Sequence, residues 1–272
     1  MSAIFNNKAI VVRGGGDLAT GVVQKLYRAG LNVLILETQA PTAIRRSVSL
    51  CEAAYDGTAQ VEDVACRKIS AIDEIDTCWQ EGLVALLVDP EGKSIKEIKP
   101  AAVIDAILAK RNLGTTRSMA DITIALGPGF DAGVDVHAVI ETMRGHDLGR
   151  LILQGYAKPD TGIPAEIGGE DSRRVLHAPS AGIIIHKKQI GSIAKQGEGL
   201  FSVNGTEVIA PFDGLLRGLI REGMQVHKGM KVADIDPRTD VDWRTVSDKA
   251  RCLGGATLEA YFYLNQITGE SI

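Results

Sequence analysis

The first half of the chain alternates short apolar runs with segments that have the spacing of an amphipathic helix. Residues 9–12 are apolar and largely β-branched, and residues 17–29 then carry apolar side chains three or four positions apart, which is the period of a helix. Residues 33–36 form the next apolar run, and this completes a strand–helix–strand unit of about 30 residues. Further apolar runs that we interpret as strands lie at residues 83–88, 101–107 (alternatively a short helix), 121–126 and 134–140. The alternation predicts an α/β layer fold with a mostly parallel sheet.

The pattern changes near residue 160, where turn-forming residues become frequent. Beyond it the apolar runs are short and are separated by turn residues about every 8–12 positions, a pattern typical of all-β structure. Residues 177–182 resemble residues 209–214, which lie 32 positions later, and Gly191 and Gly197 recur at the same offset. Repeats this short rarely bury a core alone, so we expect two interlocked halves.

These patterns predict three parts of the chain. Residues 1–165 would form the α/β domain, and residues 172–240 would form a small all-β domain. Residues 241–272 would form a C-terminal helical segment that packs back on the first domain.

Composition and charge exclude several classes of protein. Lys plus Arg is 30 and Asp plus Glu is 34, so the formal net charge is −4, without the basic footprint of a duplex nucleic-acid binder. The four cysteines contain no CxxC pair, so we expect neither a metal site nor a disulfide framework. We find no signal peptide and no apolar run near the ~20 residues that span a bilayer, so we expect a cytoplasmic protein that contacts no membrane. Glycine is the outlier, at 30 of 272 residues, and such an excess indicates tight turns or backbone close to a ligand.

The strongest local signal is a glycine-rich turn between the first strand and the first helix. Residues 13–19 fit the pattern G-x-G-x-x-A, whose small residues let the backbone approach a phosphate at the helix N-terminus. Glu37 ends the second strand, 37 − 16 = 21 residues after Gly16, where an acid can accept hydrogen bonds from a ribose. Asp17 would repel a phosphate there, unless it caps the helix or the ligand differs from NAD. The alternative is a turn that only packs helix on strand. The residues of this candidate site are Gly14, Gly15, Gly16, Asp17, Leu18 and Glu37.

Other candidate ligand-binding residues lie after further predicted strands. Arg45 and Arg46 could bind a phosphate, or could be a solvated pair of charges. The carboxyl ends of parallel strands form the ligand crevice in open α/β sheets, so a glycine loop after residues 121–126 and an aspartate after residues 83–88 would share one edge. His137, with Asp135 nearby, could act in acid–base chemistry, or could be an ordinary surface histidine. The residues added to the site are Arg45, Arg46, Asp89, Gly127, Pro128, Gly129, Phe130 and His137.

Four segments together carry a resemblance to a known family. Residues 11–21, 87–90, 126–130 and 135–142 resemble the YqeB-like accessory proteins of the selenium-dependent molybdenum hydroxylase system, distant relatives of the XdhC/CoxI maturation factors. The resemblance implies a Rossmann-like first domain and a role in maturing a molybdenum hydroxylase. It supplies no catalytic residues.

The β segment resembles the biotinyl/lipoyl carrier domain, a barrel-sandwich hybrid of two interlocked halves. The resemblance rests on the repeated Ala-Pro-x-x-Gly sequence at residues 178–182 and 210–214. Such carriers present a lysine at a tight turn, whereas residues 203–206 here read Val-Asn-Gly-Thr. We therefore expect no biotin or lipoate, and we expect a hairpin at the Asn-Gly pair.

Three hypotheses of function follow. The first is an accessory or maturation factor for a selenium-dependent molybdenum hydroxylase, which binds NAD(P), another nucleotide or a molybdopterin-type cofactor in the crevice. The second is an NAD(P)-dependent oxidoreductase, and the third is a non-enzymatic docking module for a client hydroxylase. The expected partners are thus a nucleotide-like small molecule and a client molybdenum hydroxylase, and a homo-oligomer is compatible with the sequence.

Overall fold

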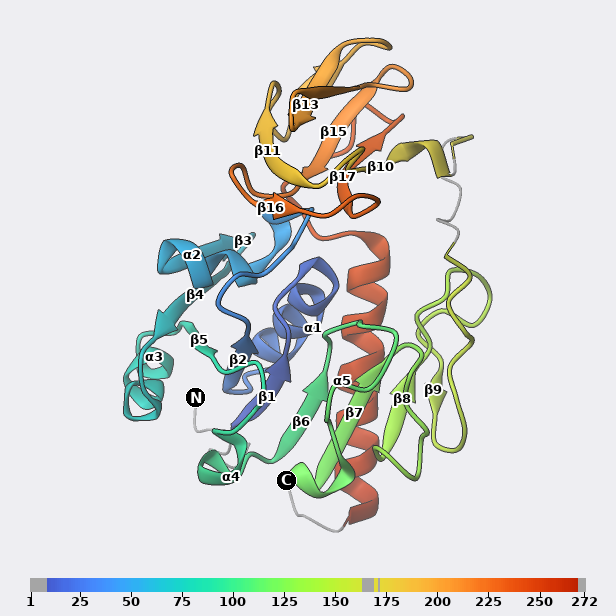
Figure 1. The fold of residues 1–272 in the computed structure, drawn as a ribbon. Helices are drawn as coiled ribbons and strands as arrows, with labels where there is room; N and C mark the ends of the chain where they lie inside the picture. The colour runs from blue at the N-terminus through green and yellow to red at the C-terminus, as the bar shows by residue number, and fades with distance from the viewer. Residues whose placement is uncertain (1–8, 163–168, 171, 269–272) are drawn as a thin grey trace. The chain divides into compact units, whose positions relative to one another are not determined.

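The computed structural model describes residues 9–162, 169–170 and 172–268 (Figure 1). The chain divides into two compact units, which we describe separately. Unit 1 contains Met1–Pro41, Ser49–Asp160 and Val246–Ile272, and unit 2 contains Thr42–Val48 and Thr161–Thr245.

Unit 1 is built on a nine-stranded mixed sheet with the strand order β3-β4-β5-β2-β1-β6-β7-β8-β9. Neighbours from β4 to β8 are parallel, and the edge pairs β3–β4 and β8–β9 are antiparallel. The central strand β1 is buried along its whole length, as expected for a parallel strand covered on both faces. The strands are β1 (Ile10–Arg13), β2 (Val33–Glu37), β3 (Thr58–Val61), β4 (Val64–Ile69), β5 (Val84–Val88), β6 (Ala102–Asp105), β7 (Ile122–Leu126), β8 (Ala138–Ile140) and β9 (Leu151–Ile152).

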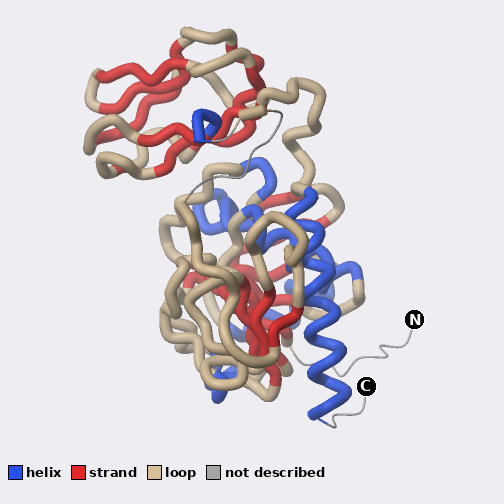
Figure 2. The backbone as a smooth tube through the Cα atoms, turned by 90° about the vertical axis from the view of Figure 1, so that its right-hand side faces the viewer, coloured by secondary structure: helices blue, strands red, loops and turns tan. Residues whose placement is uncertain are grey.

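Long helices are few in this unit. Helix α1 (Asp17–Arg28) follows β1, and Gly30, with a positive φ of 82°, ends its last turn. The other long helix is α5 (Asp248–Thr268), which lies against α1 and also contacts β7 and β8 (Figure 2). The remaining α-helices are short: α2 (Ala53–Asp56), α3 (Ile75–Gln80) and α4 (Ile95–Ile98). Within the described part of the chain, no helix combines the length and apolar character that crossing a membrane requires.

The predicted Rossmann-like layout is therefore wrong. Such a fold alternates strands with crossover helices, but the connection from β6 to β7 contains only the 3-10 turn η4 (Arg117–Met119). The connection from β7 to β8 likewise contains no helix among the described residues. Unit 1 is a mixed α/β structure with a large sheet and few helices. Individual strands predicted from apolar runs are nevertheless confirmed. Residues 121–126, for example, contain β7.

Unit 2 consists of two four-stranded antiparallel sheets, with strand orders β10-β17-β15-β12 and β14-β13-β11-β16. Asn204 and Gly205 both have positive φ and join β13 to β14 with Val203 paired to Thr206, which confirms the predicted hairpin. The two sheets replace the predicted biotinyl/lipoyl-like barrel-sandwich hybrid, which this arrangement does not support. The strands are β10 (Val175–His177), β11 (Gly182–His186), β12 (Ile193–Ala194), β13 (Gly199–Val203), β14 (Thr206–Ile209), β15 (Gly214–Leu219), β16 (Gln225–Val226) and β17 (Lys231–Asp236).

Unit 2 also contains a segment from the first third of the chain. The backbone N–H of Leu219 donates to Ile44 O at 2.8 Å, and Arg46 Nε donates to Leu219 O at 2.7 Å. The prediction that residues 1–165 form one continuous domain is thus wrong for Thr42–Val48. One backbone and one side-chain hydrogen bond to the distant strand β15 hold this segment, and no local sequence pattern predicts them.

The two long helices cross at glycines. A Cβ atom at Gly254 would overlap the carbonyl oxygen of Gly21, and one at Gly21 would overlap Ala250 O. Gly255, one residue further on, faces open space. Because small residues let helix backbones approach closely, Gly21 and Gly254 set the distance between α1 and α5.

We predict that Gly254→Val destabilises the protein and that Gly255→Ala does not. The valine must push the helices apart, and overpacking of this kind costs about 1–3 kcal/mol or more. Gly255→Ala adds a methyl group in open space and should stabilise the helix by up to about 1 kcal/mol. Urea unfolding of both variants measures the difference, and equal free energies of unfolding would contradict this account of the crossing.

Candidate functional site

The candidate site lies at the carboxyl edge of the nine-stranded sheet. The chain leaves β1 through α1 to reach β2 on one side, whereas β6 pairs with β1 on the other side. Loops that follow β1 and β6 therefore diverge, and ligands of open α/β sheets bind where the strand order reverses in this way. The residues at this edge include those of the glycine loop, Gly14–Gly16.

Two glycines of this loop are required by the protein's own packing. Gly14 has a φ of 95°, and a Cβ there would lie 3.0 Å from Ala106 O. A Cβ at Gly15 would lie 3.0 Å from the backbone nitrogen of Cys51, which donates to Gly15 O at 2.9 Å. At these two positions the loop packs directly against other segments of the same protein. This packing explains both glycines without a ligand.

The second predicted glycine loop behaves in the same way. A Cβ at Gly127 would lie 2.7 Å from Thr142 Oγ1, and one at Gly129 would lie 2.6 Å from the Cα of Arg111. Pro128 is half-buried, and Phe130 is only 3% exposed and lies in a core cluster. This loop closes on the protein itself, so its assignment to ligand contact is not supported by its packing.

Gly16 differs from the other four glycines. No heavy atom lies within 4 Å of a Cβ built there, and its φ of −65° and ψ of −178° suit any residue. It is the N-cap of α1 and accepts the first helical hydrogen bond, from the N–H of Thr20 at 2.8 Å. Neither backbone strain nor packing requires glycine at this position, which leaves open space beside the helix N-terminus.

Glu37 holds the glycine loop in place. Its Oε2 accepts a hydrogen bond from the N–H of Gly15 at 2.8 Å, and its Oε1 accepts one from the N–H of Thr38 at 2.7 Å. A carboxylate oxygen has further acceptor capacity, so a ribose hydroxyl could share this carboxylate. Asp17 and Leu18 lie in the first turn of α1, both half-buried.

Lys249 belongs to the same group of residues, although no pattern in the sequence indicates it. It lies at the start of α5, directly before Ala250, which packs on Gly21 of α1, and it is half-buried. Burial lowers the pKa of Lys249, as does the charge of Arg144, whereas Asp17, Glu141 and Asp160 act in the opposite direction. Within the described residues, its ammonium group makes no ion pair. A cation therefore stands near Asp17, whose charge had counted against a bound phosphate.

A buried network lies behind the glycine loop. The guanidinium of Arg13 is only 1% exposed and donates to Thr115 Oγ1 and, at 2.9 Å, to Pro90 O. Thr115 Oγ1 donates in turn to Asp105 Oδ2, which lies 3.9 Å from Arg13. Burial raises the pKa of Asp105, against hydrogen bonds from Thr115 and Ile107 and the charge of Arg13.

Three other predicted site residues have contacts outside this group. Arg45 and Arg46 belong to unit 2, where they donate to Thr245 O at 3.4 Å and to Leu219 O at 2.7 Å. His137 lies at the amino ends of the strands, where its Nδ1 is 2.8 Å from Thr123 Oγ1, and burial lowers its pKa. Arg45 and Arg46 thus belong to a different unit from the glycine loop, and the direction of the strands places His137 at the opposite end of the sheet.

Two further groups have structural roles. Asp89 accepts hydrogen bonds from the N–H groups of Lys93 and Ser94 at 3.0 and 2.8 Å, which holds the turn after β5. Burial raises the pKa of the Cys51 thiol, so this cysteine is no thiolate nucleophile.

Among the described residues, no group of three or more His, Cys, Asp or Glu side chains could hold a metal ion.

Comparison with curated proteins identifies a protein of similar sequence. The chain is 46% identical over 259 residues to the uncharacterized protein YqeB of Escherichia coli K12, a match that covers 95% of this chain and 48% of YqeB. The chain thus spans about half the length of the curated relative it matches. No model of a protein family matches it.

Comparison with solved structures gives weak likenesses. A succinylglutamate desuccinylase from Silicibacter sp. TM1040 is 12% identical with a TM-score of 0.24, covering 84% of each chain. An aspartoacylase family protein from Mesorhizobium loti is 10% identical with a TM-score of 0.27, covering 85% of each chain. The ectoine utilization protein EutE (DoeB) from Ruegeria pomeroyi is 13% identical with a TM-score of 0.26, covering 84% and 85%. At such TM-scores the likeness carries no argument about fold or activity.

These findings correct the resemblance given above. YqeB is described only as uncharacterized, and the similar solved structures belong to the desuccinylase and aspartoacylase families. Neither comparison supports a relationship to the XdhC/CoxI factors, to selenium or molybdenum hydroxylase maturation, or to the biotinyl/lipoyl carriers.

We predict that Thr115→Val destabilises the protein by about 1–3 kcal/mol, because it leaves a buried guanidinium N–H and a buried carboxylate without their shared partner. Thr116→Val is the matched control, since Thr116 is exposed and its hydroxyl bonds only to Ser118 among the described residues. The control should change the free energy of unfolding by less than about 0.5 kcal/mol. Chemical denaturation checks both values, and a neutral Thr115→Val would show that the network carries little stability.

Proposed function

We propose that this chain binds a nucleotide or a nucleotide-bearing cofactor at the carboxyl edge of the nine-stranded sheet. The phosphate would lie at the N-terminus of α1, beside Gly16. The observation that carries the proposal is the open space at this glycine, where neither φ nor packing demands the missing side chain. A ligand that comes close to the backbone supplies the reason for glycine, and the helix N-terminus favours an anion.

Charge at this edge supports the same proposal. Lys249 is a half-buried cation without an ion pair in the described residues, and the charge of Asp17 raises its pKa, against the larger effect of burial. An anionic ligand would complete its coordination and relieve the cost of keeping an ammonium group out of water. Glu37, which already accepts from the glycine loop, is the acceptor for a ribose hydroxyl.

Other roles find less support. The acid–base group that the sequence suggested for an oxidoreductase, His137, lies at the other end of the strands. A role in maturing a molybdenum hydroxylase rested on resemblance alone and forms no part of the proposal.

We predict that ATP, NAD or NADP raises the melting temperature of the protein and that Gly16→Leu abolishes the rise. A ligand at 100 times its Kd stabilises the folded state by about 2.7 kcal/mol. The leucine should fold with a loss of about 1 kcal/mol or less, because it enters open space but is a poorer N-cap than glycine. Gly255→Ala is the control that should keep the full rise. No rise with any of the three compounds, or an equal rise in Gly16→Leu, would refute the proposal.

We predict that Lys249→Met weakens binding of the same nucleotide about tenfold or more, because a charge-assisted hydrogen bond contributes about 1.5–3 kcal/mol. Methionine keeps the length and the apolar stem, so the fold should be retained. Lys93→Met removes an exposed lysine of the turn after β5 and should leave affinity unchanged. Isothermal titration calorimetry of the three proteins separates specific loss at Lys249 from a general effect of net charge.

A further inference from the structure

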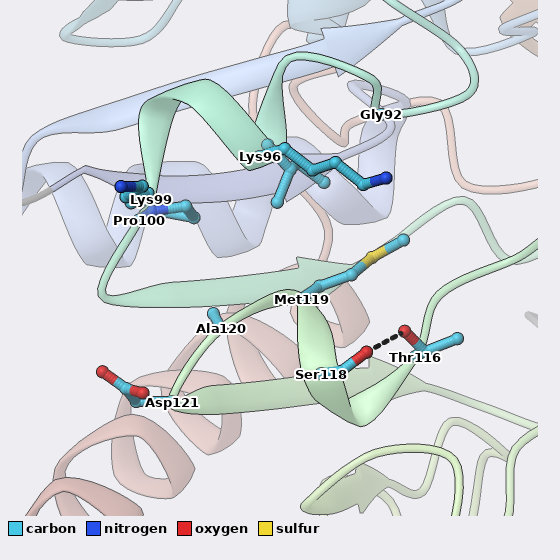
Figure 3. Close-up of a pocket in the computed structure, with 10 residues that line it drawn as sticks. Gly92, Lys96, Lys99, Pro100, Thr116, Ser118, Met119, Ala120 and Asp121 are labelled. Carbon is cyan, nitrogen blue, oxygen red and sulfur yellow. Dashed lines mark hydrogen bonds between the residues drawn. The ribbon is translucent and has the colours of Figure 1, made fainter.

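A hollow lies on one face of the nine-stranded sheet, apart from the glycine loop. Its volume is about 560 Å³, within the range of about 300–1,000 Å³ that small-molecule sites occupy. One wall comes from Gly92 and the short helix α4, and the other comes from residues 116–121, which include η4 (Figure 3). Strand β6 runs between the two walls (Figure 3).

The hollow exists because helices are short or absent on both sides of it. Helix α4 has only four residues, and the connection from β6 to β7 makes only a three-residue 3-10 turn. A crossover helix of ordinary length would cover this part of the sheet. What lies over β6 instead is a space with Ile95 and Met119 as apolar lining.

A single buried side chain holds both walls. Arg13 donates to Pro90 O, two residues before Gly92, and to Thr115 Oγ1, directly before Thr116. Its Nε lies 3.6 Å from a Cβ built at Gly92. Since Arg13 is fully buried at the end of the central strand, both walls are attached to the core of the unit. The hollow is therefore formed before any ligand binds.

The charges on the rim favour an anion. Lys96 and Lys99 are exposed, and neither makes an ion pair within the described residues. Asp121 is the acid of the lining, so the formal charge of the lining is 2 − 1 = +1. Lys96 and Met119 extend toward the end of the hollow where Thr116 and Ser118 lie, whereas Lys99 and Asp121 lie at the other end (Figure 3). The hydroxyls of Thr116 and Ser118 bond to each other at 3.0 Å.

We propose that this hollow between α4 and residues 116–121 binds a small organic anion, a carboxylate or phosphate attached to an apolar body. Lys96 supplies the charge, and one hydroxyl of the Thr116–Ser118 pair donates a hydrogen bond to the anionic group, because the proton of the other hydroxyl is used in the bond between them. Ile95 and Met119 contact the apolar body. This second site is independent of the nucleotide proposed at the glycine loop, because the two share no lining residue.

The test uses four probes of graded chemistry: butyl phosphate, butyrate, n-butanol and inorganic phosphate. Saturation-transfer NMR with the full chain measures the affinity of each. At least one of the two organic anions should bind about tenfold more tightly than both n-butanol and inorganic phosphate, because the charge and the apolar body contribute together. Preference for butyl phosphate or for butyrate identifies the anionic group. Equal affinities across the four probes, or no binding, would overturn the proposal.

Variants locate the binding. Lys96→Gln should weaken the bound organic anion about tenfold, and Met119→Trp should abolish binding by filling the hollow. Lys93→Gln is the matched control, an exposed lysine three residues before Lys96 that does not line the hollow. Gly16→Leu should leave this binding intact, so failure here is distinguishable from failure at the glycine loop. Unchanged affinity in both Lys96→Gln and Met119→Trp would refute the site.

Discussion

Arg13 lies at the end of the central strand β1, where its guanidinium cannot reach water. A buried cation without partners costs several kcal/mol, so the protein must surround it with acceptors. It finds them in Thr115 and Pro90, and Asp105 lies 3.9 Å away as the counter-charge. Pro90 lies in the connection from β5 to β6, Thr115 lies in the connection from β6 to β7, and Asp105 is the last residue of β6. The position of one charge thus fixes where these two loops run at the carboxyl edge, next to both proposed binding sites.

Glycine serves mainly to bring chain close to chain. Gly14 and Gly15 admit the loops after β6 and before α2, and Gly21 and Gly254 let the two long helices touch. Each of these positions is explained by a neighbouring backbone or side-chain atom. Gly16 differs from these positions, because the space next to it is open. The excess of glycine therefore indicates close approach, but the approaching group is usually the protein itself.

Both proposed sites favour anions, for different physical reasons. At the glycine loop the attraction comes from a helix N-terminus and from a half-buried ammonium on another helix. In the hollow over β6 it comes from the exposed Lys96 beside the apolar side chains of Ile95 and Met119. Exposed charges are screened by salt more than buried ones, so binding in the hollow should depend on ionic strength more strongly. The two sites share Arg13 as a support and can otherwise be separated by mutation.

The sequence by itself determined the strands β1, β2, β5 and β7, the helices α1 and α5, and the Asn204–Gly205 hairpin, because apolar period and turn chemistry are local properties. It did not indicate β3 and β4, the attachment of Thr42–Val48 to unit 2, or the missing helix between β6 and β7. It assigned His137, just beyond the Gly127–Phe130 loop, to the ligand site, whereas the strand direction carries this residue to the opposite edge of the sheet. Only the tertiary structure could bring Lys249 to Asp17 or show that Gly16 faces open space. Both features depend on which distant segments of the chain pack together, and local sequence patterns do not determine such packing.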